Sequence, residues 1–252
     1  STTAINDLDD LTGTGNAYTI TIADTQVTAG ALNTVNAATT VDVTVTAVTQ
    51  ITGTPTDLAT VYGGGLTGLG NEKNIVTINI THTQANTIDA YTTGVVTATL
   101  STTAIDDLDD LTGTGNSYTI TVADTQVTAA ALNTVNAATT INVTTTAITK
   151  ITGAAAELAT TYGGGLTDLG NEAIVVTDNI SHTQANTIDA YTTGIVTATL
   201  STTAIADLDD LTGTGNAYTI TVATAQVTAS ALNTVNALTT VNISAAAITQ
   251  IT

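Results

Sequence analysis

The sequence contains no cysteine, methionine, tryptophan or phenylalanine, and it has a single proline in 252 residues. Without cysteine the chain can form neither disulfides nor thiolate metal sites. Seven tyrosines are its only aromatic residues. A hydrophobic core must therefore consist of valine, isoleucine, leucine and alanine, set among many threonines, and this composition favours β-strands.

Basic residues are almost absent: 2 lysines or arginines face 21 acidic residues, for a formal net charge of −19. Such a charge argues against nucleic acids and anionic membranes as partners. No run of about 20 apolar residues predicts a membrane span, so we expect no membrane insertion. Because Ser1 and Thr252 both fall inside a repeat, we expect the chain to be part of a longer protein.

A repeat of one hundred residues dominates the sequence. Residues 1–100 reappear as 101–200 with about one position in five changed, and 201–252 are a partial third copy. A fixed period of this kind indicates stacked structural segments rather than a core closed around one pocket. We therefore predict a single continuous architecture over 1–252, built from these super-repeats.

Within each hundred residues, a shorter pattern of strand, turn and helix recurs four times, in coils of about 20, 22, 24 and 34 residues. Tyr18–Ile22 alternates apolar and polar residues, which places Ile20 and Ile22 on one face of a strand. One of the four coils fits the pattern only with an inserted residue, which suggests a β-bulge near Thr46–Ala47. Asp178 replaces Ile78 at a position that the alternation assigns to the interior, and the sequence does not say how a carboxylate fits there.

Short helices are marked by their start signals. Thr54, Pro55 and Asp57 supply a cap, a proline at the first helical position and an acidic residue at the third. Leu58 and Val61 then share one face. Similar pairs in the other helices are Leu32 with Val35, Ile88 with Tyr91, and Leu108 with Leu111.

These elements predict a repeat solenoid: a right-handed parallel β-solenoid of about ten coils, with short helices on one side. Each coil should contain a strand, a corner, a short second strand and a helix that returns to the next strand. Helices pack more widely than strands, so the solenoid should curve in the manner of leucine-rich repeats. The L-x-x-L-x-L-x-x-N signature of that family is absent.

Several phrases, among them ADTQVTAAALNTVNAATT, ITGTPTDLATVYGGGLTGLGNE and STTAIDDLDDLTGTGN, resemble tandem repeats of very large secreted or cell-surface proteins of bacteria, including cyanobacteria. This resemblance covers the whole chain. It implies an extracellular location and an adhesin, surface-layer or filament role, and it supplies no catalytic residues.

Acidic clusters are the strongest candidates for a metal site, because calcium prefers six to eight oxygen ligands. The candidate ligands are Asp7, Asp9, Asp10, Asp107, Asp109, Asp110, Asp209 and Asp210, with Asp106 beside them. Neither EF-hand spacing nor the G-G-x-G-x-D repeat is present. The alternative interpretation is a solvated helix face.

Other motifs suggest structural roles. The glycine-rich segment 63–72 lacks the lysine of a phosphate-binding loop and reads as a loop with glycines at positive φ. His82 and His182 have no partner histidine at metal spacing. Threonine pairs on strands could form ranks of the kind seen in ice-binding solenoids: Thr19/Thr21, Thr97/Thr99, Thr119/Thr121, Thr197/Thr199 and Thr219/Thr221.

The sequence thus predicts a non-catalytic structural repeat protein of an extracellular surface, acting as a stalk, adhesin or self-assembling filament. Its expected partners are copies of itself or further repeats at both ends. The alternative is a calcium-binding or, less favoured, ice-binding surface module. An enzyme would need a carboxylate cluster or basic groove on the sheet face, and neither is evident.

Overall fold

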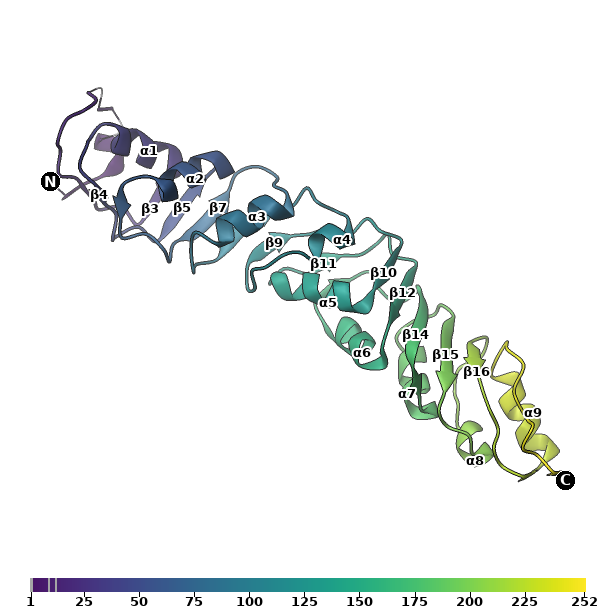
Figure 1. The fold of residues 1–252 in the computed structure, drawn as a ribbon. Coiled ribbons are helices and arrows are strands. Elements are labelled where there is room, and N and C mark those ends of the chain that lie inside the picture. The colour runs from purple at the N-terminus through teal and green to yellow at the C-terminus, as the bar shows by residue number, and fades with distance from the viewer. Residues whose placement is uncertain (1, 9, 12) are drawn as a thin grey trace. The chain divides into compact units, whose positions relative to one another are not determined.

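Parallel strands alternate with short helices along the whole computed structural model (Figure 1). The structure describes residues 2–8, 10–11 and 13–252. Its contacts divide the chain into two compact units. Unit 1 comprises 1–121 and 137–143, and unit 2 comprises 122–136 and 144–252.

Unit 1 contains two parallel sheets among its described residues. The larger has five strands in the order β3 (Gln26–Thr28), β5 (Gln50–Gly53), β7 (Lys73–Val76), β8 (Val96–Thr99) and β9 (Ser117–Thr119). The smaller has four strands in the order β1 (Thr2–Thr3), β2 (Thr21–Ile22), β4 (Val43–Thr44) and β6 (Leu66–Thr67). Its helices are η1 (Ile5–Asp7), α1 (Ala29–Ala37), α2 (Pro55–Gly63), α3 (His82–Asp89) and α4 (Ile105–Leu108).

Unit 2 repeats this arrangement. Its five-stranded parallel sheet has the order β10 (Gln126–Thr128), β12 (Lys150–Gly153), β14 (Ala173–Ile180), β15 (Val196–Leu200) and β16 (Ala217–Thr219), and β17 (Gln226–Val227) pairs with β18 (Gln250–Ile251). Two further short strands are β11 (Val143–Thr144) and β13 (Leu166–Thr167). The helices of the second half of the chain are α5 (Ala129–Ala138), α6 (Ala155–Gly163), α7 (His182–Asp189), α8 (Ile205–Leu208) and α9 (Ala229–Ala237).

The aliphatic residues predicted to face inward form the core. Ile20, Ile22, Leu32 and Val35 are buried, as are Leu58, Val61, Leu108 and Leu111. Isoleucine, valine and leucine carry out this packing with two fully buried tyrosines, Tyr118 and Tyr218. Burial of each aliphatic side chain stabilises the fold by about 1.5–3 kcal/mol.

The predicted helix starts are confirmed. Thr54 caps α2, its Oγ1 accepting from the Asp57 backbone N–H at 3.2 Å, and Pro55 occupies the first helical position. Thr28 caps α1 in the same way. In α3 the cap is Thr81, which forms a capping box with Gln84.

The strands of the described residues lie in separate parallel sheets, the largest of five strands. Two predictions about the strands are wrong. Thr46–Ala47 is a turn between β4 and β5, and a register shift occurs instead between Val175 and Asn179. Ile78 is 52% exposed, so this position faces solvent.

The predicted spread of coil lengths is also too wide. Helices α1 to α4 begin at Ala29, Pro55, His82 and Ile105, and α5 begins at Ala129. Each interval is close to a quarter of the hundred-residue repeat. The interval that contains the glycine-rich segment, from Pro55 to His82, is about as long as the others.

Candidate functional site

Pairs of consecutive threonines form the most regular polar feature of the described residues. We call them Thr-Thr corners: Thr39–Thr40, Thr92–Thr93, Thr139–Thr140, Thr192–Thr193 and Thr239–Thr240. The second threonine donates both its backbone N–H and its hydroxyl to one carbonyl oxygen of an earlier turn. For Thr93 the acceptor is the Gly70 oxygen, at 2.8 and 3.1 Å. Thr40, Thr140, Thr193 and Thr240 repeat the pattern.

The first threonine of each corner joins two segments. Thr92 Oγ1 donates to the Glu72 carbonyl oxygen at 2.7 Å and accepts from the Gly94 backbone N–H at 2.9 Å. Thr39 does the same with the Tyr18 carbonyl and the Val41 N–H, and it also accepts from the Tyr18 N–H. Hydroxyls of this type satisfy backbone groups that neither helix nor sheet reaches. Each corner thus ties its turn to backbone 20 to 24 residues earlier.

Asparagines on the helices make the corresponding bonds in the forward direction. Asn86 donates from Nδ2 to the Asp110 carbonyl oxygen at 2.9 Å and accepts at Oδ1 from the Thr112 N–H at 3.0 Å. Asn186 repeats both bonds with Asp210 and Thr212. Asn33 reaches the Asp57 carbonyl oxygen at 3.0 Å. These side-chain amides therefore connect one helix to backbone groups in or just after the next helix along the chain.

Side chains from a later segment of the chain cap the first N–H of several helices. Ile5 N donates to Asp24 Oδ2 at 2.6 Å, His82 N to Thr102 Oγ1 at 3.1 Å, and Ala155 N to Asp178 Oδ1 at 2.9 Å. These groups are orphan donors at a helix N-terminus. This explains Asp178, which is exposed and serves as a cap.

Two buried glutamates lie at the ends of the glycine-rich segments. Glu72 and Glu172 are 0% and 1% exposed. The Glu72 carboxylate accepts from the Gly70 backbone N–H at 2.9 Å and from the Tyr62 hydroxyl at 3.1 Å. Gly68 and Gly70 have φ of 96° and 131°, which confirms the predicted role of these glycines.

One tyrosine of a stacked pair is hydrogen-bonded to each of these carboxylates. Tyr62 stacks on Tyr91 with ring centroids 4.9 Å apart, and Tyr162 stacks on Tyr191 at 4.7 Å. The Tyr162 hydroxyl donates to Glu172 Oε1. Burial, reinforced by this hydrogen bond and by the negative charge of Glu172, raises the pKa of Tyr162 above its ordinary value of 10.0.

Tyr118 and Tyr218 are 1% exposed, and among the described atoms their hydroxyls have no hydrogen-bond partner. Burial, with a contribution from the charges of Asp89 and Asp189 respectively, raises the pKa of each phenol. Tyr18, at the equivalent position of the first repeat, is 43% exposed. Burial of this ring therefore depends on the segment that precedes it.

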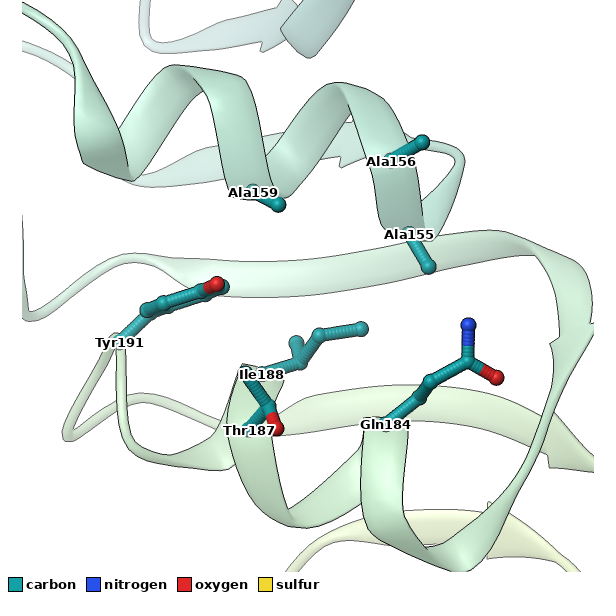
Figure 2. A pocket seen from close by; sticks show the side chains of 7 residues that line it. All are labelled: Ala155, Ala156, Ala159, Gln184, Thr187, Ile188 and Tyr191. Carbon is teal, nitrogen blue, oxygen red and sulfur yellow. The ribbon is translucent and has the colours of Figure 1, made fainter.

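A groove of about 220 Å³ lies between α6 and α7 (Figure 2). Ala155, Ala156 and Ala159 line it from α6, and Gln184, Thr187 and Ile188 line it from α7, with the ring of Tyr191 at one end. In the first repeat, Pro55 and Thr56 stand where α6 has Ala155 and Ala156. The groove is small, shallow and largely apolar.

The aspartates predicted as calcium ligands lie at the surface. Asp7 and Asp10 are exposed near η1, and those of the later repeats lie on or just after α4 and α8: Asp106, Asp107, Asp109, Asp110, Asp209 and Asp210. Asp9 lies outside the described residues. Within the described part of the chain, no three His, Cys, Asp or Glu side chains come together as a metal site would require. Calcium binding stays a prediction.

The remaining candidates are placed as follows. His82 and His182 begin α3 and α7, and their rings lie within 3.4 Å of Thr102 and Thr202 Oγ1. The predicted threonine ranks are formed in part. Thr99 pairs with Thr119 and Thr199 with Thr219, whereas Thr97 pairs with Ser117 and Thr197 with Ala217. In the four-stranded sheet Thr21, Thr44 and Thr67 lie in register. Ice binding stays a prediction.

Comparison with protein-family models, curated proteins and solved structures gave no match. Among the described residues, none of the helices has both the length and the apolar character needed to cross a membrane.

Proposed function

We propose that this chain is a non-catalytic structural repeat protein whose mechanism is the stacking of successive coils. The observation that carries the proposal is the Thr-Thr corner, found five times among the described residues with the same bonds to earlier backbone. Two corners of this kind occur in each complete hundred-residue repeat, so every further repeat adds two more. Such recurrence supports extension of the chain as the function.

The distribution of polar groups supports the same proposal. Buried polar side chains bond to backbone groups: Thr92 Oγ1 donates to the Glu72 carbonyl oxygen, Asn116 Oδ1 accepts from the Val96 N–H, and the Glu72 carboxylate accepts from the Gly70 N–H. Each arrangement recurs one hundred residues later with the same partners. An enzyme would gain little from repeating one site in this way, whereas a stack needs the same contact at every level.

As the finer architecture, we propose one right-handed parallel solenoid of about ten coils over 1–252, with leucine-rich-repeat-like geometry. Parallel strands joined through a helix almost always cross over with this hand. The alternation of parallel strands and helices is compatible with it.

As the biological setting, we propose an extracellular surface, where the chain acts as a stalk, adhesin or filament. A coil of the same type, from another copy of the chain, would pack against the coil that contains Leu232 and Ile251. Leu232 is half-buried and Ile251 is 56% exposed, whereas Leu32, Leu132, Ile51 and Ile151 are fully buried at equivalent positions. The packing around the buried equivalents of Leu232 and Ile251 within the chain thus shows what the contact between two copies would be.

Concentration-dependent assembly tests this proposal. Sedimentation velocity and electron micrographs of the purified chain at rising concentration should show linear assemblies. Ile251→Asp should weaken them, and Ile78→Asp, at an exposed position away from that face, should not. A chain that stays monomeric at the highest concentration, or an Ile251→Asp variant that assembles normally, would contradict self-stacking.

A further inference from the structure

Because of the composition of the chain, an oxidant would react mainly with its tyrosines. Cysteine, methionine and tryptophan are the usual sinks for oxidants in proteins, and the chain contains none of them. Its seven tyrosines are therefore the most readily oxidised side chains, beside two histidines. Their arrangement decides what products an oxidant would form.

Four of the seven tyrosines are held in two face-to-face pairs. Tyr62, on α2, and Tyr91, just after α3, have ring centroids 4.9 Å apart and ring planes inclined by 16°. Tyr162 and Tyr191 lie at 4.7 Å and 9°. At these separations the ring faces are close to van der Waals contact. Each pair joins two consecutive helices of one chain.

One phenol of each pair is already bonded to a proton acceptor. The Tyr62 hydroxyl lies 3.1 Å from Glu72 Oε2, and the Tyr162 hydroxyl donates to Glu172 Oε1. Both carboxylates are buried, so each is held in place for that phenol. Loss of an electron from a phenol makes its proton strongly acidic, and a hydrogen-bonded carboxylate can accept it in the same step.

The second ring of each pair, that of Tyr91 or Tyr191, is partly exposed. In unit 2 the ring of Tyr191 borders the groove between α6 and α7 (Figure 2). The small side chains of Ala155, Ala156 and Ala159 leave about 220 Å³ open beside it. That volume admits a small oxidant such as hydrogen peroxide. The Tyr191 ring is partly exposed, so it can also transfer an electron to an oxidant too large to enter the groove.

We propose that Tyr62–Tyr91 and Tyr162–Tyr191 are sites of oxidative cross-linking, each pair forming a dityrosine within one chain. Two phenols each give up one electron and the hydroxyl proton, and the two radicals form a carbon–carbon bond between positions ortho to the oxygens. The hydrogen on each coupled carbon then moves to the phenol oxygen of its own ring, which restores both aromatic rings and both hydroxyls. Hydrogen peroxide, acting through a peroxidase, accepts both electrons and both protons and leaves as two molecules of water. The product is a covalent tie between consecutive helices.

This inference does not depend on the proposed function, because both pairs lie within a single chain. The test treats the full chain, kept dilute, with peroxidase and hydrogen peroxide. The expected result is dityrosine fluorescence in a monomer that has lost two hydrogen atoms per bond, with peptide mapping linking Tyr62 to Tyr91 and Tyr162 to Tyr191. Absence of dityrosine, or dityrosine only between chains, would overturn the proposal.

Matched variants separate the pairs from the other tyrosines. Tyr91→Phe with Tyr191→Phe keeps two stacked rings but removes one phenol from each pair, so the intrachain product should vanish while the melting temperature stays nearly unchanged. Tyr18→Phe, at an exposed unpaired ring, should leave the intrachain yield unaltered. An intrachain link that survives Tyr91→Phe with Tyr191→Phe would assign the chemistry to other tyrosines and reject the proposal.

The rate of dityrosine formation tests whether Glu72 and Glu172 act as proton acceptors. Glu72→Gln with Glu172→Gln keeps a side chain of the same shape but removes the proton acceptor, so the rate of dityrosine formation should fall at least several-fold near neutral pH. Circular dichroism of the same samples shows whether the fold is retained. An unchanged rate in a folded variant would remove the glutamates from the mechanism.

Discussion

Single residues that differ between the repeats compensate one another. Pro55 has no backbone N–H, and the residue of the first repeat that is equivalent to Asp178 is the exposed Ile78. In the second repeat Ala155 has an N–H, and Asp178 accepts from it at 2.9 Å. A proline at the first helical position needs no acceptor, whereas any other residue benefits from one. The two pairs are alternative solutions to the same local requirement.

This pairing predicts a coupled effect on stability. Asp178→Ile should lower the free energy of unfolding by about 1 kcal/mol, because it removes a helix cap. Adding Ala155→Pro should restore the loss, since the orphan N–H is then absent. Denaturant unfolding of the two single variants and the double variant measures the coupling. Strictly additive effects would contradict the compensation.

Buried tyrosines give the stability a pH dependence on the alkaline side. Burial raises the pKa of Tyr62, Tyr118, Tyr162 and Tyr218 above 10.0, so the fold favours the neutral phenol. Their contribution is fully present below pH 10 and is lost as the pH rises through the higher folded values. Four phenols should therefore ionise only well above pH 10 or as the chain unfolds, as followed by phenolate absorbance and circular dichroism. Ionisation of all seven near pH 10 in a folded chain would contradict this.

Tyr118 and Tyr218 provide a control, since their buried hydroxyls lack partners. Replacement of each by phenylalanine should change the stability near neutral pH by less than about 0.5 kcal/mol and should extend the folded range to higher pH. A large loss of stability at neutral pH would indicate an essential role for these hydroxyls.

At the level of elements, helices of 4 to 10 residues are held by bonds to neighbouring segments. Isolated helices this short are marginal in water. Caps such as Thr54 and apolar pairs such as Leu32 with Val35 could be predicted from the sequence, because both depend on spacing within a few residues. The Thr-Thr corners could not, because their acceptors lie 20 to 24 residues away. The exposure of Ile78 was missed because β7 ends at Val76, and alternation does not continue past the strand.

The corners predict a large effect for a nearly isosteric change. Thr92→Val removes the hydroxyl that bonds to the Glu72 carbonyl and the Gly94 N–H. It leaves both backbone groups short of a partner in a buried site and should cost about 2–3 kcal/mol. Thr87→Val, which loses only a bond within α3, is the control and should change stability by no more than about 0.5 kcal/mol. Equal effects in thermal or denaturant unfolding would contradict a special role for the corner.

At the scale of the whole molecule, the contacts recur with the hundred-residue period. The tie between Asp89 Oδ1 and the Asn116 side chain, 2.7 Å, reappears between Asp189 and Asn216 at 2.6 Å. Period and segment order were evident from the sequence. The points at which one sheet ends and the next begins were not, because strand pairing depends on backbone geometry at each turn. If stacking of equivalent segments accounts for the fold, one complete hundred-residue repeat can be removed and the fold retained.

Deletion of residues 101–200 tests this claim most directly. It joins Leu100 to Ser201, a junction identical in sequence to Leu100–Ser101, and it keeps every type of contact between neighbouring segments. The shortened chain should unfold cooperatively with unchanged circular dichroism per residue, and with a denaturant slope reduced in step with the buried surface removed. Deletion of 101–150, which breaks the period, should instead give a poorly folded chain. A 101–200 deletion that fails to fold, or two deletions that behave alike, would contradict the account.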